Sequence, residues 1–261
     1  MKETLLDVRG LSYKYPSSEA SIVNSLDLTI FEKEIVAIVG SNGSGKSTLL
    51  RLLAGLLEPD SIGKGTTLRA EASGRPLPVT QVDWRMILRK HVTLGHQQVS
   101  EVLLPWQTKR AALEWVECEE ENTTRINSAL DLGSSEDDDK YWSQLSGGQR
   151  QRVLLARVFR TCPRLVCLDE PVSALDFRSK NRFAESCRTF VDSGIAGAIV
   201  VVVHDPTDAA RLATERVLVA ASEPNQPLSL VEHKVHTGEN ISERVRALVD
   251  KMESVIERGV R

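Results

Sequence analysis

The apolar residues of this chain gather in short continuous runs. The three clearest are EIVAIVG (34–40), RLVCLDE (164–170) and AIVVVVHD (198–205). Such runs are typical of strands buried on both faces, because a half-buried strand alternates apolar with polar positions. Residues 4–11 and 26–31 alternate only weakly, which indicates edge strands. We therefore expect a central sheet of buried strands with more exposed strands beside it.

Helical patterns separate these strands. A leucine-rich helix is predicted from about Lys46 to Leu57, ahead of Pro59, and another helix of about 16 residues is predicted from Phe177. Strand, helix and buried strand in succession predict a parallel sheet with helices on its faces, an α/β fold. Residues 103–160 carry helical patterning without a convincing strand pattern, which predicts a helical subdomain inserted into the sheet domain.

The last apolar pattern is a helical stripe within residues 242–258. It consists of Val245, Leu248, Val249, Met252, Val255 and Ile256. This spacing places the six side chains on one face of a helix. We expect a terminal helix docked on its own domain, and a helix that binds a partner is the alternative.

Composition narrows the functional classes. The 261 residues are 41% hydrophobic, enough to bury the core of one large domain with a subdomain. The formal net charge of −3 does not favour nucleic acid as the main partner. Carboxylates crowd between Glu114 and Asp139, where Arg125 is the one basic residue, and we interpret this segment as a solvated surface.

The cysteines and the lengths of the apolar runs indicate the cellular compartment in which the protein works. The four cysteines show no CxxC pair and no metal-ligand spacing; they are Cys118, Cys162, Cys167 and Cys187. Because no signal-peptide pattern is present, we expect reduced thiols in the cytosol. The longest apolar stretch, 198–203, is far shorter than the roughly 18 residues of a membrane helix. A membrane role would therefore depend on a partner protein.

The segment GSNGSGKST (40–48) carries the first chemical signal. Gly40, Gly45, Lys46 and Ser47 fit GxxxxGK[ST], between a buried strand and a helix. Glycines let backbone N–H groups approach an anion, and the helix N-terminus adds unpaired donors. Lys46, which we expect to be solvated without ligand, can reach the outer phosphates, and the Ser47 hydroxyl can bind Mg²⁺. The alternative, an ordinary glycine-serine turn, does not explain this context.

Two acidic residues end the second buried strand. Asp169 is placed to hold Mg²⁺, directly or through water, and Glu170 could polarise an attacking water. A second anion site is predicted at LSGGQRQR (145–152), where Ser146 is a good N-cap. Gly147 and Gly148 cost about 1 kcal/mol each relative to alanine in a helix, which a bound anion would offset.

In this order the motifs resemble the ATP-binding cassette (ABC) ATPases over almost the whole chain. The order is GSNGSGKST, VTLGHQQ (92–98), LSGGQ, LVCLDEP, SALD (173–176) and His204. The resemblance implies an α/β P-loop NTPase core of the RecA-like type, with a parallel sheet and an antiparallel β subdomain. It divides the chain into a core (1–97 and 161–235), a helical signature subdomain (98–160) and a C-terminal helical tail (236–261).

The resemblance also implies roles at a site for ATP and Mg²⁺. Lys46, Glu170 and His204 would be catalytic, with Glu170 as general base and His204 sensing the γ-phosphate. Ser47, Gln97 and Asp169 would serve Mg²⁺. The residues that would contact nucleotide are Tyr15, Gly40, Ser41, Asn42, Gly43, Ser44, Gly45, Lys46, Ser47, Thr48, Gln97, Ser146, Gly147, Gly148, Gln149, Asp169 and Asp176.

Some of these assignments leave an alternative open. Tyr15 would stack on adenine, with Tyr13 as the alternative, and Gln98 stands next to Gln97. The LSGGQ residues would contact ATP on the opposite subunit of a head-to-tail dimer, and Asp176 belongs to a loop that crosses this interface.

The family counterpart of a single cassette is the separate ATPase subunit of a transporter. It would dimerise with an identical or a different cassette subunit and bind polytopic permease subunits on the cytoplasmic face of a membrane, as a peripheral protein. The segment LLPWQT (103–108) is similar to LLPW in ATPases of nitrate, sulfonate and taurine importers, although Trp106 in the core explains it nearly as well.

The family leaves two further functions open. LGHQ (94–97) is similar to cassettes of haem exporters of the cytochrome-maturation type. A soluble cassette ATPase of the cluster-assembly type is the other alternative. We favour import and expect no nucleic-acid partner. Residues 60–90 match no particular subfamily, and SIGKGTTLRAEASGRPLP (61–78) within them reads as an enlarged loop.

Overall fold

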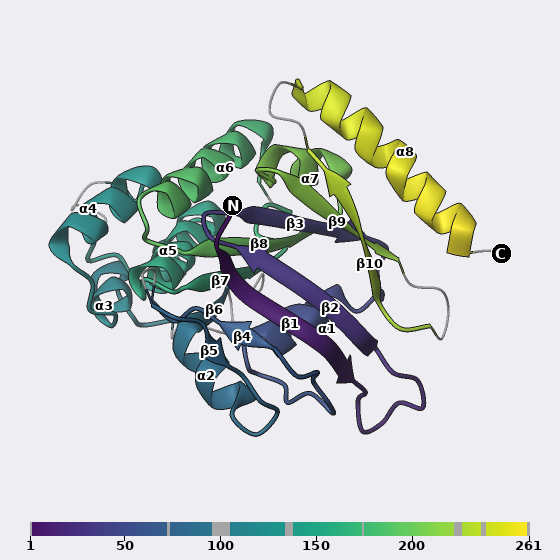
Figure 1. Cartoon of the computed structure of the whole chain (residues 1–261). Coiled ribbons are helices and arrows are strands. Elements are labelled where there is room, and N and C mark those ends of the chain that lie inside the picture. Colours follow the sequence, from purple (N-terminus) through teal and green to yellow (C-terminus); the bar gives the residue numbers. More distant parts are fainter. Residues whose placement is uncertain are drawn as a thin grey trace.

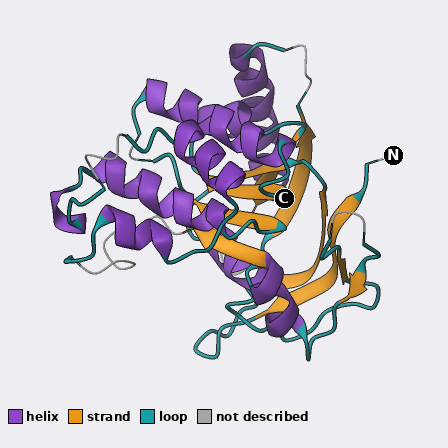
Figure 2. Ribbon diagram, turned by 90° about the vertical axis from the view of Figure 1, so that its left-hand side faces the viewer, coloured by secondary structure: helices purple, strands orange, loops and turns teal. Residues whose placement is uncertain are grey.

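The computed structural model describes residues 2–71, 74–95, 105–133, 138–173, 175–221, 226–235 and 239–259. In this part of the chain no helix is both long and apolar enough to cross a membrane. Two sheets and the helices around them form the structure (Figures 1 and 2).

The larger sheet has six strands in the order β10-β9-β3-β8-β7-β6. Five of them run parallel, and β10 pairs antiparallel with β9 at one edge. Their bounds are β3 Ile35–Gly40, β6 Val92–Gly95, β7 Leu165–Asp169, β8 Ala198–Val203, β9 Arg216–Ala221 and β10 Ser229–Lys234. The three buried runs of the sequence are therefore strands of one parallel sheet, as predicted.

Each central strand contributes to two hydrophobic cores. Ile35, Ala37 and Val39 of β3 belong to one core, while Val36 and Ile38 belong to the other. Alternate side chains of a strand point to opposite faces, so a strand with both faces covered needs an uninterrupted apolar run. This requirement explains the sequence pattern of the buried strands.

The first core is covered by helices. They are α5 (Gly147–Arg160), α6 (Phe177–Asp192), α7 (Pro206–Leu212) and α8 (Ile241–Gly259). In α8, Leu248 and Val255 are buried in this core, so the terminal helix docks on its own domain, as predicted. Figure 1 shows α8, in yellow, lying beside α7 and the β9–β10 edge.

The second core lies between the large sheet and a four-stranded antiparallel sheet. That sheet has the order β2-β1-β4-β5, with bounds β1 Thr4–Tyr13, β2 Val23–Phe31, β4 Thr67–Leu68 and β5 Leu77–Pro78. Helix α1 (Lys46–Leu53) fills this core with four buried leucines. It ends before the predicted Leu57, because Gly55 takes a left-handed φ of 66° that stops the helix.

Residues 61–78, expected to form an enlarged loop, also contain the two short strands β4 and β5, and helix α2 (Trp84–His91) follows them. The buried Trp84 indole donates a hydrogen bond to the Leu52 carbonyl oxygen at 3.0 Å, which fastens α2 to the end of α1. Strands of two residues carry no readable periodicity, and this is why the sequence did not reveal them.

The helical insertion is present as predicted. It contains α3 (Lys109–Glu114), α4 (Glu120–Ala129), a short 3-10 helix (Trp142–Gln144) and α5. Figure 1 shows α3 and α4 at the far side of α5 from the antiparallel sheet. Trp106 is 69% exposed, so it is not a core residue, and that explanation of LLPWQT was wrong.

Candidate functional site

The phosphate loop joins β3 to α1 at the carboxyl edge of the parallel sheet. A Cβ on Gly40 would lie 2.4 Å from the Ala220 carbonyl oxygen, and one on Gly45 would lie 2.8 Å from the Ile22 side chain. Gly43 and Gly45 also have left-handed φ values of 78° and 93°. These positions require glycine, and the resulting loop presents backbone rather than side chains to an anion.

Lys46 is buried in the phosphate loop rather than solvated, so that expectation was wrong. It is 4% exposed, and its Nζ donates to the carbonyl oxygens of Gly40 at 2.9 Å and Ser41 at 2.6 Å, and to Ser44 Oγ at 3.3 Å. Burial lowers the pKa of Lys46, and the charges of Glu170 and Asp169 oppose that shift. The loop carbonyls replace water as hydrogen-bond acceptors for the Lys46 ammonium.

Asp169, Glu170 and His204 meet where neighbouring strands end. Parallel pairing sets Asp169 of β7 opposite Val202 of β8. Glu170 and His204 therefore follow the carboxyl ends of two neighbouring strands. Glu170 takes a left-handed φ of 50°, and its Oε1 contacts Nε2 of His204. A backbone strained at a non-glycine residue is a mark of functional positions.

Asp169 has an oxygen available for a cation. Its Oδ1 is buried and has no hydrogen-bond partner among the described residues. A buried carboxylate oxygen without a partner is costly, and a divalent cation would satisfy it. The donor set therefore fits Mg²⁺ at the end of β7, and the Ser47 hydroxyl at the start of α1 is the other group predicted to serve it.

The two tyrosines near the loop differ in burial. Tyr13 is 7% exposed and belongs to the second core, whereas Tyr15 is half-buried. Their rings meet edge to face at 5.0 Å, and the Tyr15 hydroxyl lies 3.2 Å from Thr48 Oγ1. Only Tyr15 combines contact with the phosphate-loop helix and an accessible ring, which favours it over Tyr13 for stacking on adenine.

The predicted second anion site is a capped helix N-terminus. Ser146 is the N-cap of α5, as predicted: its Oγ accepts from Gln149 N at 3.2 Å, and Gln149 Oε1 accepts from Ser146 N at 2.9 Å. A Cβ on Gly147 would meet no described atom within 4 Å, and one on Gly148 only Arg152 Nη1 at 3.6 Å. These glycines are therefore not required by packing within the chain.

Asp176 is the N-cap of α6. Its Oδ1 accepts from Ser179 N at 2.9 Å, and hydrogen bonds from Ser179 lower the pKa of the exposed Asp176 carboxyl.

Sequence reasoning missed Gln151 of α5, whose Nε2 donates to the Pro171 carbonyl next to Glu170 and so joins the LSGGQ helix to the acidic pair. Gln97, Gln98 and Leu103 lie outside the described residues, as does Ala174 of SALD.

Known proteins share both sequence and fold with this chain. The family described as "ABC transporter" matches residues 23–173. The sulfate/thiosulfate import ATP-binding protein CysA of Synechococcus elongatus is 35% identical over 217 residues, 82% of this chain and 59% of that protein. The taurine import ATP-binding protein TauB of Pseudomonas savastanoi pv. phaseolicola is 32% identical over 236 residues, 88% of this chain and 82% of that protein.

Solved structures agree in fold. A dimeric post-hydrolysis structure of the ATP-binding cassette MJ0796, bound to ADP and Pi, has a TM-score of 0.65 at 24% identity and covers 89% of this chain and 99% of that chain. Since the family match covers more than half of the chain and contains both the phosphate loop and the Asp169–Glu170 pair, the chain belongs to the ABC transporter family of ATPases.

Proposed function

We propose that this chain hydrolyses ATP as the energy-supplying subunit of an importer. The observation that carries the proposal is the convergence of Lys46, Asp169, Glu170 and His204 at one edge of the parallel sheet. This set supplies a cation for phosphate, a carboxylate oxygen for Mg²⁺, a base for water and a polar group beside that base.

The chemistry follows from the position of each group. Phosphate oxygens replace the carbonyls that hold Lys46, because an anion forms a stronger hydrogen bond with an ammonium than a neutral acceptor does. Mg²⁺, when bound, neutralises phosphate charge and orients the terminal phosphate. Glu170 accepts the proton of the attacking water. His204, released from Glu170, donates to the γ-phosphate.

A second subunit completes the site. The helix N-terminus at Gly147 and Gly148 offers backbone donors and positive dipole, and among the described residues only the Arg152 guanidinium would come within 4 Å of a Cβ added at these two glycines. In a head-to-tail dimer with a like or unlike cassette subunit, these donors reach ATP held by the partner's phosphate loop. Asp176, exposed at the start of α6, lies at the same interface.

The partner in the membrane is a polytopic permease. Two sequence relatives named as import ATP-binding proteins favour uptake of a solute. Trp106, exposed at the entry to the helical subdomain, is suited to contact a permease segment, since exposed aromatic residues are enriched at interfaces. The chain would then be a peripheral protein on the cytoplasmic face of a membrane.

The Glu170→Gln variant tests both parts of this proposal. The amide cannot take the proton from water, so turnover should fall by about a hundredfold or more while ATP still binds. With ATP and Mg²⁺ the variant should accumulate as a dimer in size-exclusion chromatography. Purified from membranes in mild detergent, it should carry a polytopic membrane protein with it.

Glu185→Gln is the matched control, because it makes the same chemical change at an exposed position of α6. It should keep wild-type turnover. Unchanged turnover in Glu170→Gln would refute the assignment of the base. A variant that stays monomeric at every concentration would refute the dimer, and recovery without any membrane protein would refute the role in transport.

A further inference from the structure

A partly buried ion pair joins the first turns of α6 and α7. Lys180 of α6 donates its Nζ to Asp208 Oδ2 of α7 at 2.6 Å. Lys180 lies one turn after Asp176, to whose carbonyl its own N–H donates at 2.9 Å. Asp208 N–H donates to the Asp205 carbonyl at 3.0 Å, and Asp205 directly follows His204. One ion pair therefore links the segment of Asp176 to the segment of His204.

Asp208 and Glu34 are the two buried acidic residues among those that the structure describes, and Asp208 is 4% exposed. Its second oxygen, Oδ1, accepts from Arg211 Nη1 at 2.8 Å. Two cations and the N-terminal dipole of α7 thus compensate for burial of one carboxylate. A buried carboxylate with this many partners has a fixed position, and it fixes the helix that carries it.

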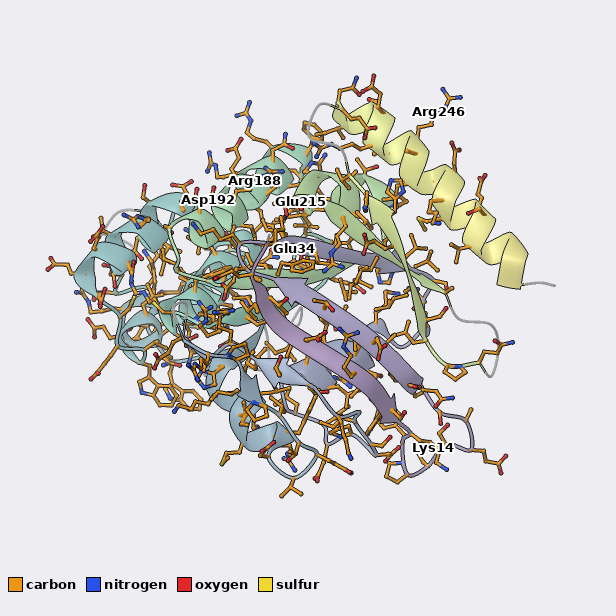
Figure 3. All side chains as sticks on the ribbon, viewed as in Figure 1. Lys14, Glu34, Arg188, Asp192, Glu215 and Arg246 are labelled. Atoms are coloured by element: carbon orange, nitrogen blue, oxygen red, sulfur yellow. The ribbon has the colours of Figure 1, made fainter. Side chains whose placement is uncertain are left out.

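The other end of α7 is held to the same helix. Arg188 of α6, labelled in Figure 3, donates its Nη2 to the Arg211 carbonyl at 2.6 Å. The Arg211 guanidinium lies 4.8 Å from the ring centre of Phe177, which directly follows Asp176. Helices α6 and α7 lie side by side in Figure 1. These polar contacts with α6 add to the packing of the seven-residue α7 against β3 and α8.

We propose that Asp208 is a positioning residue that sets the place of His204 through α7. The proposal rests on the function proposed above. His204 contacts Glu170, and a hydrogen bond of this kind is lost when either partner moves by about an ångström. Through Lys180, the same carboxylate couples His204 to the segment of Asp176, which the proposed function places at the interface with a second subunit.

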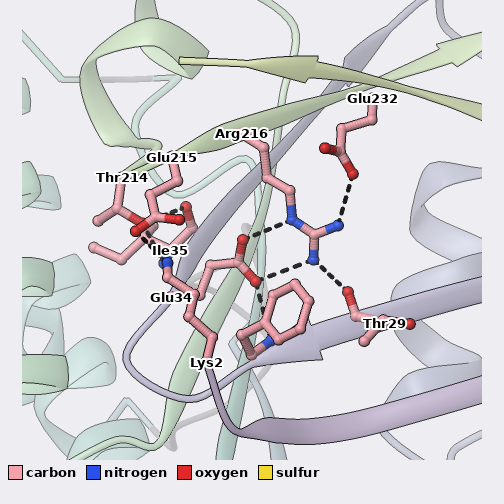
Figure 4. Close-up of polar contacts among 9 residues, drawn as sticks. Lys2, Thr29, Glu34, Ile35, Thr214, Glu215, Arg216 and Glu232 are labelled. Carbon is pink, nitrogen blue, oxygen red and sulfur yellow. Dashed lines mark hydrogen bonds and ion pairs between the residues drawn. The ribbon is translucent and has the colours of Figure 1, made fainter. Parts of the chain in front are cut away.

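The chain provides a matched control in a second buried ion pair. Glu34, which is 1% exposed, accepts from Arg216 Nε at 2.6 Å and from Arg216 Nη2 at 3.0 Å. Figure 4 shows this pair with Glu232 and the Thr29 carbonyl, where β2 meets the large sheet. Glu34 precedes β3, and His204 follows β8 at the opposite end of these paired strands, about 20 Å away along the strands at ~3.3 Å per residue.

The test compares Asp208→Asn with Glu34→Gln, at a temperature where circular dichroism shows both variants to be folded. Both substitutions neutralise a buried carboxylate and should lower the denaturation midpoint. Only Asp208→Asn should lower kcat, by about ten- to hundredfold, with KM for ATP changed less than about threefold. Lys180→Met, which breaks the bridge between helices but leaves the Asp208–Arg211 pair, should act likewise and serves if Asp208→Asn does not fold.

A second comparison separates positioning from general destabilisation. In a His204→Ala background, Asp208→Asn should change the residual kcat by less than about twofold, since a residue that acts through His204 has no effect once His204 is gone. Equal losses of kcat in Asp208→Asn and Glu34→Gln, or additive losses with His204→Ala, would overturn the proposal. A wild-type chain without ATPase activity would instead overturn the proposed function, and this inference with it.

Discussion

At the residue scale, the ligand-free site is held together by the groups that would bind ATP. Lys46 donates to two loop carbonyls, and Glu170 contacts His204. The first interaction satisfies the buried Lys46 ammonium, which would be costly to leave without a partner. Phosphate and water offer replacements for both, so nucleotide binding exchanges hydrogen bonds without losing them.

Cysteine reactivity gives a prediction at the same scale. Partial burial of the sulfur, the neighbouring Cys118 thiol and the Glu119 charge raise the pKa of Cys162 to about 11. Only the thiolate reacts with iodoacetamide. Cys162 should therefore be alkylated slowly at pH 8, although the residue is exposed, and about tenfold faster for each added pH unit up to about pH 11. Mass spectrometry of the peptides after timed labelling measures this rate.

Two controls bracket that experiment. Cys118→Ser removes one of the groups that raise the pKa, so Cys162 should react faster in this variant. The chain unfolded in urea should label all four cysteines at the rate of a free thiol. Cys167 and Cys187, whose pKa values are raised by complete burial, should stay unlabelled in the folded chain. Rapid labelling of Cys162 at pH 7 in the folded wild type would contradict the prediction.

At the scale of elements, a substitution at the N-terminus of α5 should change ATP turnover without changing the stability of the fold. Gly148→Asp places a carboxylate where a helix dipole favours it, and the new Cβ has ordinary clearance from Arg152 Nη1. The free energy of unfolding should change by no more than about 0.5 kcal/mol. If this helix start binds phosphate of a partner's ATP, turnover should still fall by more than about tenfold, because the carboxylate repels that phosphate.

Urea denaturation and steady-state ATPase assays measure the two quantities. Gly148→Ala is the matched variant: it adds the same Cβ without the charge and should retain more turnover than Gly148→Asp. Wild-type activity in Gly148→Asp would mean that this helix start does not meet nucleotide. A large loss of stability would mean that packing within the chain, and not an anion, explains the glycine.

Strands with a long continuous apolar run were predictable from the sequence. The run 34–40 became β3, and residues 164–170 contain β7, because a strand covered on both faces must be apolar throughout. The two-residue β4 and β5 and the seven-residue α7 were not foreseen, since such short elements depend on their neighbours rather than on their own periodicity.

The site was predictable in part for a related reason. The phosphate loop is local, so spacing alone identifies Gly45, Lys46 and Ser47. The Glu170–His204 contact depends on β7 lying next to β8, and the burial of Lys46 depends on how the loop folds back. The pair Lys180–Asp208 depends on two helices meeting face to face. Such contacts follow from topology, which the sequence pattern leaves open.

At the scale of the whole molecule, the phosphate loop and the LSGGQ helix start, which together would form the proposed site, belong to different parts of the fold. The phosphate loop belongs to the sheet core, and the LSGGQ helix start belongs to the helical insertion that Figure 2 shows beside it. A helix offers its N-terminal donors along one direction. In a head-to-tail dimer, each helix start would face the partner's loop, and two identical sites would form across one interface.

Cysteine cross-linking tests this arrangement. Ser41→Cys and Gly148→Cys are placed in separate chains, both carrying Glu170→Gln to retain ATP, and Cys118→Ser with Cys162→Ser to remove the less buried native thiols. Each chain then has one introduced cysteine, so a bond between them can only join two subunits. With ATP, Mg²⁺ and a mild oxidant, mixing the chains should give a covalent dimer on a non-reducing gel.

The controls decide the geometry. Either chain alone should give little covalent dimer, because two Ser41 positions, or two Gly148 positions, lie apart in a head-to-tail pair. Without ATP the mixed dimer should be weak, since nucleotide is what holds the two surfaces together. A third chain with both cysteines should form the bond between subunits and not within itself. If that chain instead closes on itself as a monomer while the mixed chains stay unlinked, the LSGGQ helix faces its own phosphate loop, and the composite site is wrong.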